Sequence, residues 1–177
     1  MYAVDLFLDS RASRYVNSIW QALSDSGIDS SLKDTDGLSP HITLAIYEDV
    51  DEAKFIERMK EFKSRFKVID TKFDSIGVFP TSGACFMAPT ITQELINYHK
   101  EYYEFFKEFE DSAREYYLPG NWNPHCSIAM GLSKEKMKKV VDFTIDIFKP
   151  FEASLDGIAL YKVEIEDGKF TDSIRLF

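Results

Sequence analysis

Short apolar stretches alternate along the chain with longer amphipathic ones. Stretches in which apolar residues alternate with other residues or run together are typical of β-strands. Such stretches lie at residues 2–8, 41–47, 68–79, 84–88, 125–130, 153–165 and 170–177. Apolar residues recur with helical spacing at residues 10–26, 51–66, 92–117 and 133–148, and Asp9 or Ser10, Asp51, Thr92 and Ser133 offer N-caps. The pattern therefore predicts seven strands and four helices.

Turn residues separate these elements. Residues 80–83 (Pro-Thr-Ser-Gly) predict a hairpin, residues 166–169 predict a second one, and Pro119-Gly120 is expected to end the third helix. Hairpins join the strands without a regular strand–helix–strand alternation. This order predicts an α+β fold with antiparallel sheets.

The two halves of the chain resemble each other. Residues 66–79 align without gaps with residues 148–161, at an offset of 82. In each half a helix precedes a short strand, and a second helix and a two-strand hairpin follow it. Because only two copies are present, the pattern predicts one domain over residues 1–177, built from two pseudo-symmetric lobes, rather than a longer repeat array.

A motif of the form Pro-His-x-(Thr/Ser)-apolar-Ala occurs once in each half. The first copy is PHITLA at residues 40–45, and the second is PHCSIA at residues 124–129. Two of the three histidines in the chain, His41 and His125, lie in these copies. Chance placement of both copies from composition alone is improbable. A paired-histidine site is therefore the leading hypothesis about function.

Strand geometry predicts which side chains of each motif lie on the same face. Because side chains alternate across a strand, the histidine, the hydroxyl residue (Thr43 or Ser127) and the alanine (Ala45 or Ala129) are expected on one face. Two histidines can serve as general base and general acid, and the hydroxyls can bond phosphate oxygens. The pattern predicts metal-independent cleavage of a phosphodiester, since no carboxylate cluster accompanies either motif.

Simpler explanations compete with this one. A single Pro-His-x-Thr motif is most often structural, and only the second copy on a matching strand favours a site. His99 lies between Tyr98 and Tyr102 in the third predicted helix, where a surface or packing role is expected. The aromatic stripe of that helix is expected to be core rather than a platform for bases.

The chain is acidic, with a net charge of −9 and a pI of about 4.9. It is therefore a poor candidate for binding long nucleic acid through phosphates, although it could act on a nucleotide or an RNA end. No apolar stretch approaches the roughly 20 residues that span a membrane. The N-terminal segment lacks the basic start of a signal peptide. We expect a cytoplasmic protein.

The two cysteines, Cys85 and Cys126, form neither a disulfide framework nor the spacing of a zinc site. A bridge between them is conceivable, but free thiols are the preferred interpretation. Cys126 is expected to point into the core, away from the face that carries His125. We expect no metal and no cofactor.

Both motifs, half a chain apart, resemble those of the 2H phosphoesterase superfamily. It is named for two His-x-(Thr/Ser)-x motifs and includes LigT-like 2′-5′ RNA ligases and RNA 2′,3′-cyclic phosphodiesterases. Trp122, ahead of the second Pro-His, also resembles the second motif of the family. The resemblance implies two antiparallel sheets with flanking helices, facing each other across a central cleft. It also implies that His41 and His125 are the acid and base, in an order left open, and that Thr43 and Ser127 bind the phosphate.

The resemblance implies a hydrolase that acts on a 2′,3′-cyclic phosphate or a 2′-5′ phosphodiester of a nucleotide or RNA end. By microscopic reversibility the same site could join ends as a 2′-5′ RNA ligase. The alternative is a non-catalytic module that binds a nucleotide or RNA terminus, and a third hypothesis is a partner-recognition domain with an idle site. We expect a monomer without a membrane partner or a surface for long nucleic acid.

Candidate substrate-binding residues flank the motifs. Four aromatic residues could stack on a base, with core packing as the alternative: Trp122, Phe79, Phe86 and Tyr161. Lys162 and Arg175, in the C-terminal hairpin, are the nearest plausible cations, with ordinary surface charge as the alternative.

Overall fold

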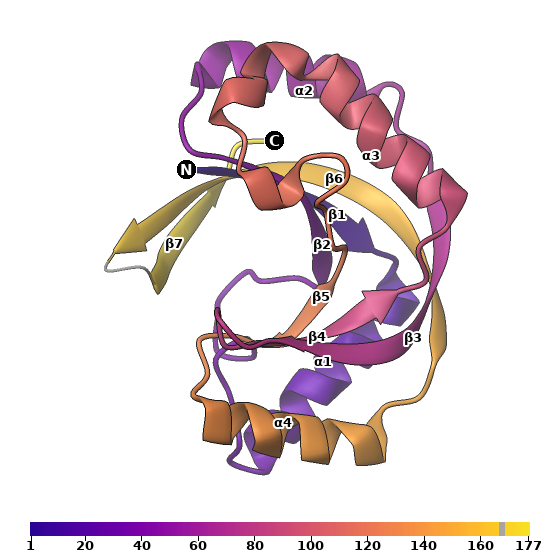
Figure 1. Cartoon of the computed structure of the whole chain (residues 1–177), viewed down its shortest axis with the longest axis vertical. Coiled ribbons are helices and arrows are strands. Elements are labelled where there is room, and N and C mark those ends of the chain that lie inside the picture. Colours follow the sequence, from indigo (N-terminus) through magenta and orange to yellow (C-terminus); the bar gives the residue numbers. More distant parts are fainter. Residues whose placement is uncertain (167–168) are drawn as a thin grey trace.

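The computed structural model describes residues 1–166 and 169–177 (Figure 1). Its strands are β1 (Tyr2–Leu8), β2 (His41–Tyr47), β3 (Ile69–Phe79), β4 (Ala84–Pro89), β5 (Cys126–Ala129), β6 (Phe151–Glu166) and β7 (Lys169–Arg175). Its α-helices are α1 (Ser10–Asp25), α2 (Glu52–Lys63), α3 (Gln93–Phe105) and α4 (Lys134–Ile147). The predicted α+β class is confirmed. The turn predicted at residues 166–169 contains Asp167 and Gly168, which lie outside the described residues.

All strand pairs are antiparallel, and the described part of the chain forms one sheet of seven strands. The strand order is β2-β1-β6-β3-β4-β5, with β7 also paired to β6. Two separate sheets were expected, and the structure joins them. The reason is the length of β6, whose first residues pair with β3 and whose later residues pair with β1 and β7.

The strand order reads symmetrically from its middle, with β2, β1 and β6 matching β5, β4 and β3. The registers match as well. Asp5 of β1 lies opposite Thr43 of β2, as Phe86 of β4 lies opposite Ser127 of β5. This correspondence agrees with the internal duplication seen in the sequence.

The sheet is strongly bent, with helices on its outer side (Figure 1). Helices α2 and α3 cover the half that contains β1 and β2, whereas α1 and α4 cover the half that contains β4 and β5. The two repeats are therefore interleaved. Trp20 of α1, from the first repeat, donates its indole N–H to the Ser127 carbonyl in the second motif, at 3.1 Å. The bend also brings the edge strands β2 and β5 into contact.

Aromatic side chains fill the core between α2 and α3. Phe62 of α2 packs against Tyr98, Tyr102 and Phe106, with ring centroids 5.4 to 5.7 Å apart. Tyr102 and Phe106 are fully buried. The expectation that this aromatic stripe is core is confirmed.

The third helix is shorter than predicted, because it ends at Phe105 rather than near residue 117. Two 3₁₀ turns follow, at Lys107–Ser112 and Glu115–Tyr117. The chain here pairs with the end of β2, since Arg114 N–H donates to the Ile46 carbonyl at 2.8 Å. These long-range hydrogen bonds take the place of those that a longer helix would make, so the helix ends earlier than predicted.

Among the described residues, no helix is both long and apolar enough to cross a bilayer.

Candidate active site

The same backbone contact orients both motif histidines. Nδ1 of His41 lies 2.7 Å from the Ser39 carbonyl oxygen, and Nδ1 of His125 lies 2.7 Å from that of Asn123. Because a carbonyl oxygen only accepts, each Nδ1 carries a proton and donates it. Nε2 of each ring is then the nitrogen that can accept a proton when the ring is neutral and donate one when it is charged.

The two histidines lie near enough to interact. Burial lowers the pKa of His125, and the charge of His41 lowers it further, against the opposing hydrogen bond to Asn123. The backbone of His41 also hydrogen-bonds the Cys126 thiol, whose pKa burial raises to about 12. The two motif strands, β2 and β5, are thus in contact. The catalytic roles of the two histidines remain a prediction.

Each motif strand contains a β-bulge directly after its hydroxyl residue. The pairing of β2 with β1 skips Leu44, and the pairing of β5 with β4 skips Ile128. A bulge reverses the alternation of side chains. Ala45 and Ala129 are therefore fully buried on the core side of their strands. The prediction that these alanines lie beside the hydroxyls is wrong.

The hydroxyl residues keep their predicted position. Thr43 and Ser127 are half-buried, while Ile42 and Cys126, their neighbours on the opposite face, are buried. Cys126 thus points into the core as expected, and both Cys126 and Cys85 are free thiols.

Trp122 connects the loop before β5 to the first motif. Its indole N–H donates to the Thr43 carbonyl at 2.9 Å, and its ring stacks on His99 with centroids 4.1 Å apart. His99 donates its Nε2 proton to the Tyr117 carbonyl at 2.8 Å, and burial lowers its pKa to about 4. Of the two interpretations of Trp122, the structure supports packing. His99 has the packing role that was expected.

Aromatic rings surround His125. The Phe79 ring meets it edge-on at 4.9 Å and the Phe86 ring lies at 5.2 Å, while these two rings stack on each other at 4.3 Å. Phe86 is buried, whereas Phe79 is half-buried. Phe79 therefore retains surface for a base. Tyr161 lies on the other half of the sheet, with its ring 6.2 Å from that of Phe7.

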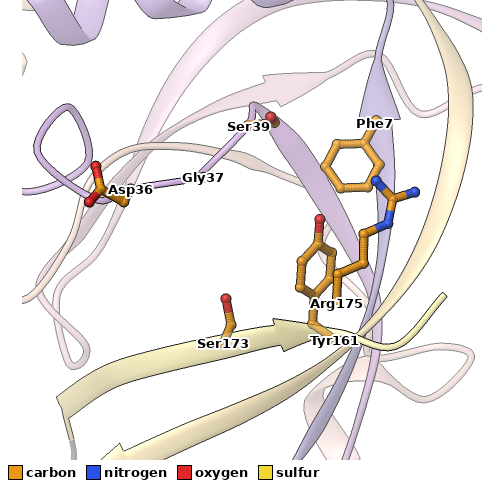
Figure 2. A pocket seen from close by; sticks show the side chains of 7 residues that line it. All are labelled: Phe7, Asp36, Gly37, Ser39, Tyr161, Ser173 and Arg175. Carbon is orange, nitrogen blue, oxygen red and sulfur yellow. The ribbon is translucent and has the colours of Figure 1, made fainter.

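A pocket of about 370 Å³ adjoins the first motif. Its lining residues are Phe7, Asp36, Gly37, Ser39, Tyr161, Ser173 and Arg175 (Figure 2). Phe7 lies 6.2 Å from the His41 ring, and Ser39 supplies the carbonyl bonded to His41. Two predicted substrate-binding residues, Tyr161 and Arg175, thus line the same pocket. The central cleft implied between the two motifs stays a prediction.

Lys162 does not share this pocket. Its ammonium pairs with the Glu52 carboxylate of α2 at 2.8 Å, and β-strand alternation places it on the face opposite to Tyr161. Of the two interpretations of Lys162, the structure supports ordinary surface charge.

Comparison with known proteins gives the family. A family model described as the 2'-5' RNA ligase superfamily matches residues 9–165. The chain belongs to this superfamily. The matched range contains both histidine motifs, so the relationship to 2H phosphoesterases expected from the motifs is confirmed.

Two solved structures align with almost the whole chain. A crystal structure of a phosphoesterase aligns with a TM-score of 0.58 and 11% identity, over 99% of this chain and 97% of that chain. A structure of Kluyveromyces marxianus Usb1 aligns with a TM-score of 0.49 and 14% identity, over 99% and 96% of the two chains. The first likeness supports the fold alone. No curated protein matches the chain.

One residue beside the superfamily motif escaped the sequence reasoning. Asp5 of β1 is buried, and its Oδ1 lies 3.9 Å from Nε2 of His41. Among residues 1–166 and 169–177, that oxygen has no hydrogen-bond partner. The signal in the sequence was a single charged residue, Asp5, in the otherwise apolar strand β1.

Proposed function

We propose that the chain is a metal-independent phosphodiesterase in which His41 and His125 carry out acid–base catalysis. The proposed substrate is a 2′,3′-cyclic phosphate or a 2′-5′ phosphodiester of a nucleotide or RNA end. The observation that carries this proposal is the matched pair of Nδ1 contacts at 2.7 Å, which leaves Nε2 of both rings for proton transfer. Superfamily membership supports chemistry on such phosphodiesters.

The proposed reaction balances with two proton transfers. One histidine Nε2 takes a proton from water as the water oxygen bonds to phosphorus. The bond from phosphorus to one ribose oxygen breaks, and the other histidine gives its Nε2 proton to that oxygen. The product is a phosphate monoester. If the 5′-hydroxyl of an RNA end attacked the 2′,3′-cyclic phosphate in place of water, one histidine would take its proton, the bond from phosphorus to the 3′-oxygen would break, the other histidine would protonate that oxygen, and the product would be a 2′-5′ linkage.

The hydroxyls of Thr43 and Ser127 are proposed to bond the non-bridging phosphate oxygens. The pocket beside the first motif is proposed to take the nucleoside part of the substrate. Tyr161 and Arg175 offer it polar groups, and Phe7 offers an apolar wall. Phe79, half-buried beside His125, is proposed to contact a base on the other side.

The test is turnover of 2′,3′-cyclic nucleotides, measured with and without a chelator. We expect His41→Ala and His125→Ala each to lower kcat/KM by about 10² to 10⁴, the range for loss of a general acid or base. His99→Gln, which replaces the remaining histidine, should stay active at neutral pH. Full activity of both motif variants would contradict the mechanism, and loss of turnover with chelator would contradict metal independence.

The binding-module hypothesis makes a different prediction. It requires nucleotide binding without product, and loss of that binding in the Thr43→Ala, Ser127→Ala double variant. A catalyst should instead show a bell-shaped dependence of kcat/KM on pH. Absence of turnover combined with measurable affinity would replace the proposed enzyme with a binding protein.

A further inference from the structure

Strand β7 breaks the symmetry between the two halves of the sheet. Among the strands that the structure describes, β2, β1 and β6 match β5, β4 and β3, whereas β7 lies off this order and pairs with β6. Strand β3 ends at Phe79, whereas β6 continues beyond Tyr161, the residue that aligns with Phe79, as far as Glu166. This continuation of β6 pairs with β7. The half that contains the first motif therefore has a strand without a match among the described strands of the other half.

This additional strand places Arg175 beside the candidate site. Arg175 lies opposite Tyr161 in the register of β7 with β6, so the two side chains lie on the same face of the sheet. Both line the pocket of about 370 Å³ that adjoins the first motif (Figure 2). Phe7, another lining residue, has its ring 6.2 Å from the ring of Tyr161 and 6.2 Å from that of His41. The pocket therefore extends from the surroundings of His41 to Arg175.

The guanidinium of Arg175 is oriented and keeps hydrogen-bond donors for a ligand. Its Nε donates to the Phe177 carbonyl at 2.9 Å, and the Leu176 N–H fixes the next residue by donating to the Leu160 carbonyl at 2.9 Å. No carboxylate whose side chain the structure describes forms an ion pair with Arg175. The two terminal nitrogens are therefore available, and a guanidinium can bind phosphate oxygens through two parallel hydrogen bonds.

The charges of the pocket lie on opposite sides. Asp36 is the lining residue with the opposite charge to Arg175, and Figure 2 shows it across the pocket from that side chain. Burial raises the pKa of Tyr161, and the charge of Arg175 opposes this rise only in part, so Tyr161 is a neutral hydroxyl beside the cation. An anionic group of a ligand is therefore favoured next to Arg175 and Tyr161, whereas Asp36 suits the hydroxyl and amine donors of a nucleoside.

The size of the pocket restricts what lies between this anionic group and His41. Ligand pockets commonly measure about 300 to 1,000 Å³. The volume of about 370 Å³ here therefore suits one nucleoside. A nucleoside 2′,3′-cyclic phosphate has its cyclic phosphate at one edge of the ribose and its 5′ oxygen on the other side. With the cyclic phosphate at the histidines, the 5′ oxygen would lie toward the end of the pocket that contains Arg175.

We propose that Arg175 binds a 5′-phosphate of the substrate, and that the enzyme selects cyclic phosphates whose nucleoside is also phosphorylated at its 5′ oxygen. This inference rests on the proposed function. The 5′-phosphate is a monoester in a free nucleotide and a diester in an RNA end, and both present oxygens to the guanidinium. Arg175 is a specificity residue, since no bond forms or breaks at the 5′-phosphate.

The kinetic test compares three substrates. They are adenosine 2′,3′-cyclic phosphate, its 5′-phosphomonoester, and the dinucleotide in which a second adenosine is joined through that 5′-phosphate. We expect the wild type to have a kcat/KM about 10-fold or more higher on at least one of the two 5′-phosphorylated substrates, mainly through a lower KM. A preference for the monoester identifies a free nucleotide as the source of the phosphate, and an equal or greater preference for the dinucleotide identifies an RNA end.

Variants assign the preference to Arg175. Arg175→Met should reduce the preference for a 5′-phosphate to about 3-fold or less. Arg175→Lys, which keeps the charge but not the two parallel bonds, should retain part of it. Arg14→Met, which removes an exposed arginine of α1, is the matched control and should keep the full preference. Thermal unfolding of each variant verifies that it is folded.

A binding test examines the same subsite without turnover. Calorimetry compares adenosine 3′,5′-bisphosphate with adenosine 3′-phosphate, because these two probes differ only in the 5′-phosphate. The bisphosphate should bind the wild type about 10-fold or more tightly than the monophosphate. Most of that difference should disappear in Arg175→Met and remain in Arg14→Met.

The outcomes separate the two proposals. Absence of turnover on all three substrates overturns the proposed function, and equal affinity for the two probes then overturns the role of Arg175 as well. Turnover without any preference for a 5′-phosphate, or with a preference that survives Arg175→Met, overturns the inference alone. An equal fall in kcat/KM on all three substrates in a folded Arg175→Met variant also overturns it, because Arg175 would then act on the scissile phosphate or on the fold.

Discussion

Mild acid should destabilise the protein through His99, the histidine outside the motifs. This side chain is 2% exposed, stacks on Trp122 and donates to the Tyr117 carbonyl, and burial lowers its pKa from 6.5 to about 4. The unfolded chain therefore binds a proton at this residue before the folded chain does. The stabilising effect of the neutral ring is fully present above pH 6.5 and is lost as pH falls toward 4.

The size of the effect follows from the shift. A difference of roughly 2.5 pKa units corresponds to about 3 kcal/mol in total, of which about 2 kcal/mol is lost between pH 7 and pH 5. The assay is urea unfolding at both pH values for the wild type and for His99→Gln. Glutamine does not titrate and its amide can still donate to the Tyr117 carbonyl.

Other titrating groups, including His125, are present in both proteins and cancel in the comparison. The wild type should lose about 2 kcal/mol more than His99→Gln between the two pH values, or about 4 to 8 °C in melting temperature. Equal losses in the two proteins would refute the reasoning, because His99 would then titrate alike in the folded and unfolded chains.

Three further predictions concern the surroundings of the motifs. Trp122→Phe and its counterpart Trp20→Phe each remove an indole N–H bond to a motif carbonyl and leave a small void, so each should cost about 1 to 3 kcal/mol in urea unfolding. For Trp122→Phe, a raised KM without lost stability would instead indicate stacking on substrate. Gly77→Ala would place a Cβ 2.6 Å from the Phe86 ring, so we expect reduced kcat in a folded protein, and unchanged kcat would contradict this. The Cys126 thiol, with its pKa raised to about 12, should react with a chromogenic disulfide reagent only in urea, and rapid labelling of the folded chain would disprove its burial.

The pattern of apolar and polar residues was sufficient to predict the bounds of the elements whose contacts are mainly local. The bounds of β1 and β2 are those that apolar alternation predicts. The third helix was predicted too long because its end is set by Arg114 and its neighbours, which bond to the end of β2 some 65 residues away along the chain. Sequence periodicity carries no information about such a partner.

Part of the candidate site was also visible in the sequence. The repeated motif identified His41 and His125, and alternation placed Thr43 on the same face as His41. The bulges that bury Ala45 and Ala129 depend on how each strand pairs with its neighbour, which a single strand does not reveal. The proximity of Asp5 to His41 depends on the same strand pairing and was missed for that reason.

Because the sheet is bent, the distance between the two motif histidines depends on the angle between its two halves. Neighbouring strands lie about 4.8 Å apart, so each edge strand is about 12 Å from the seam between β3 and β6. Closing or opening each half by about 5° would move each histidine by about 1 Å, a displacement that can change catalysis about 100-fold. Phe73 and Phe151 stack at 5.1 Å on that seam, and the Trp122 bond ties the opposite edges together. Substitutions at the seam, far from any substrate atom, should therefore tune the rate through the curvature of the sheet.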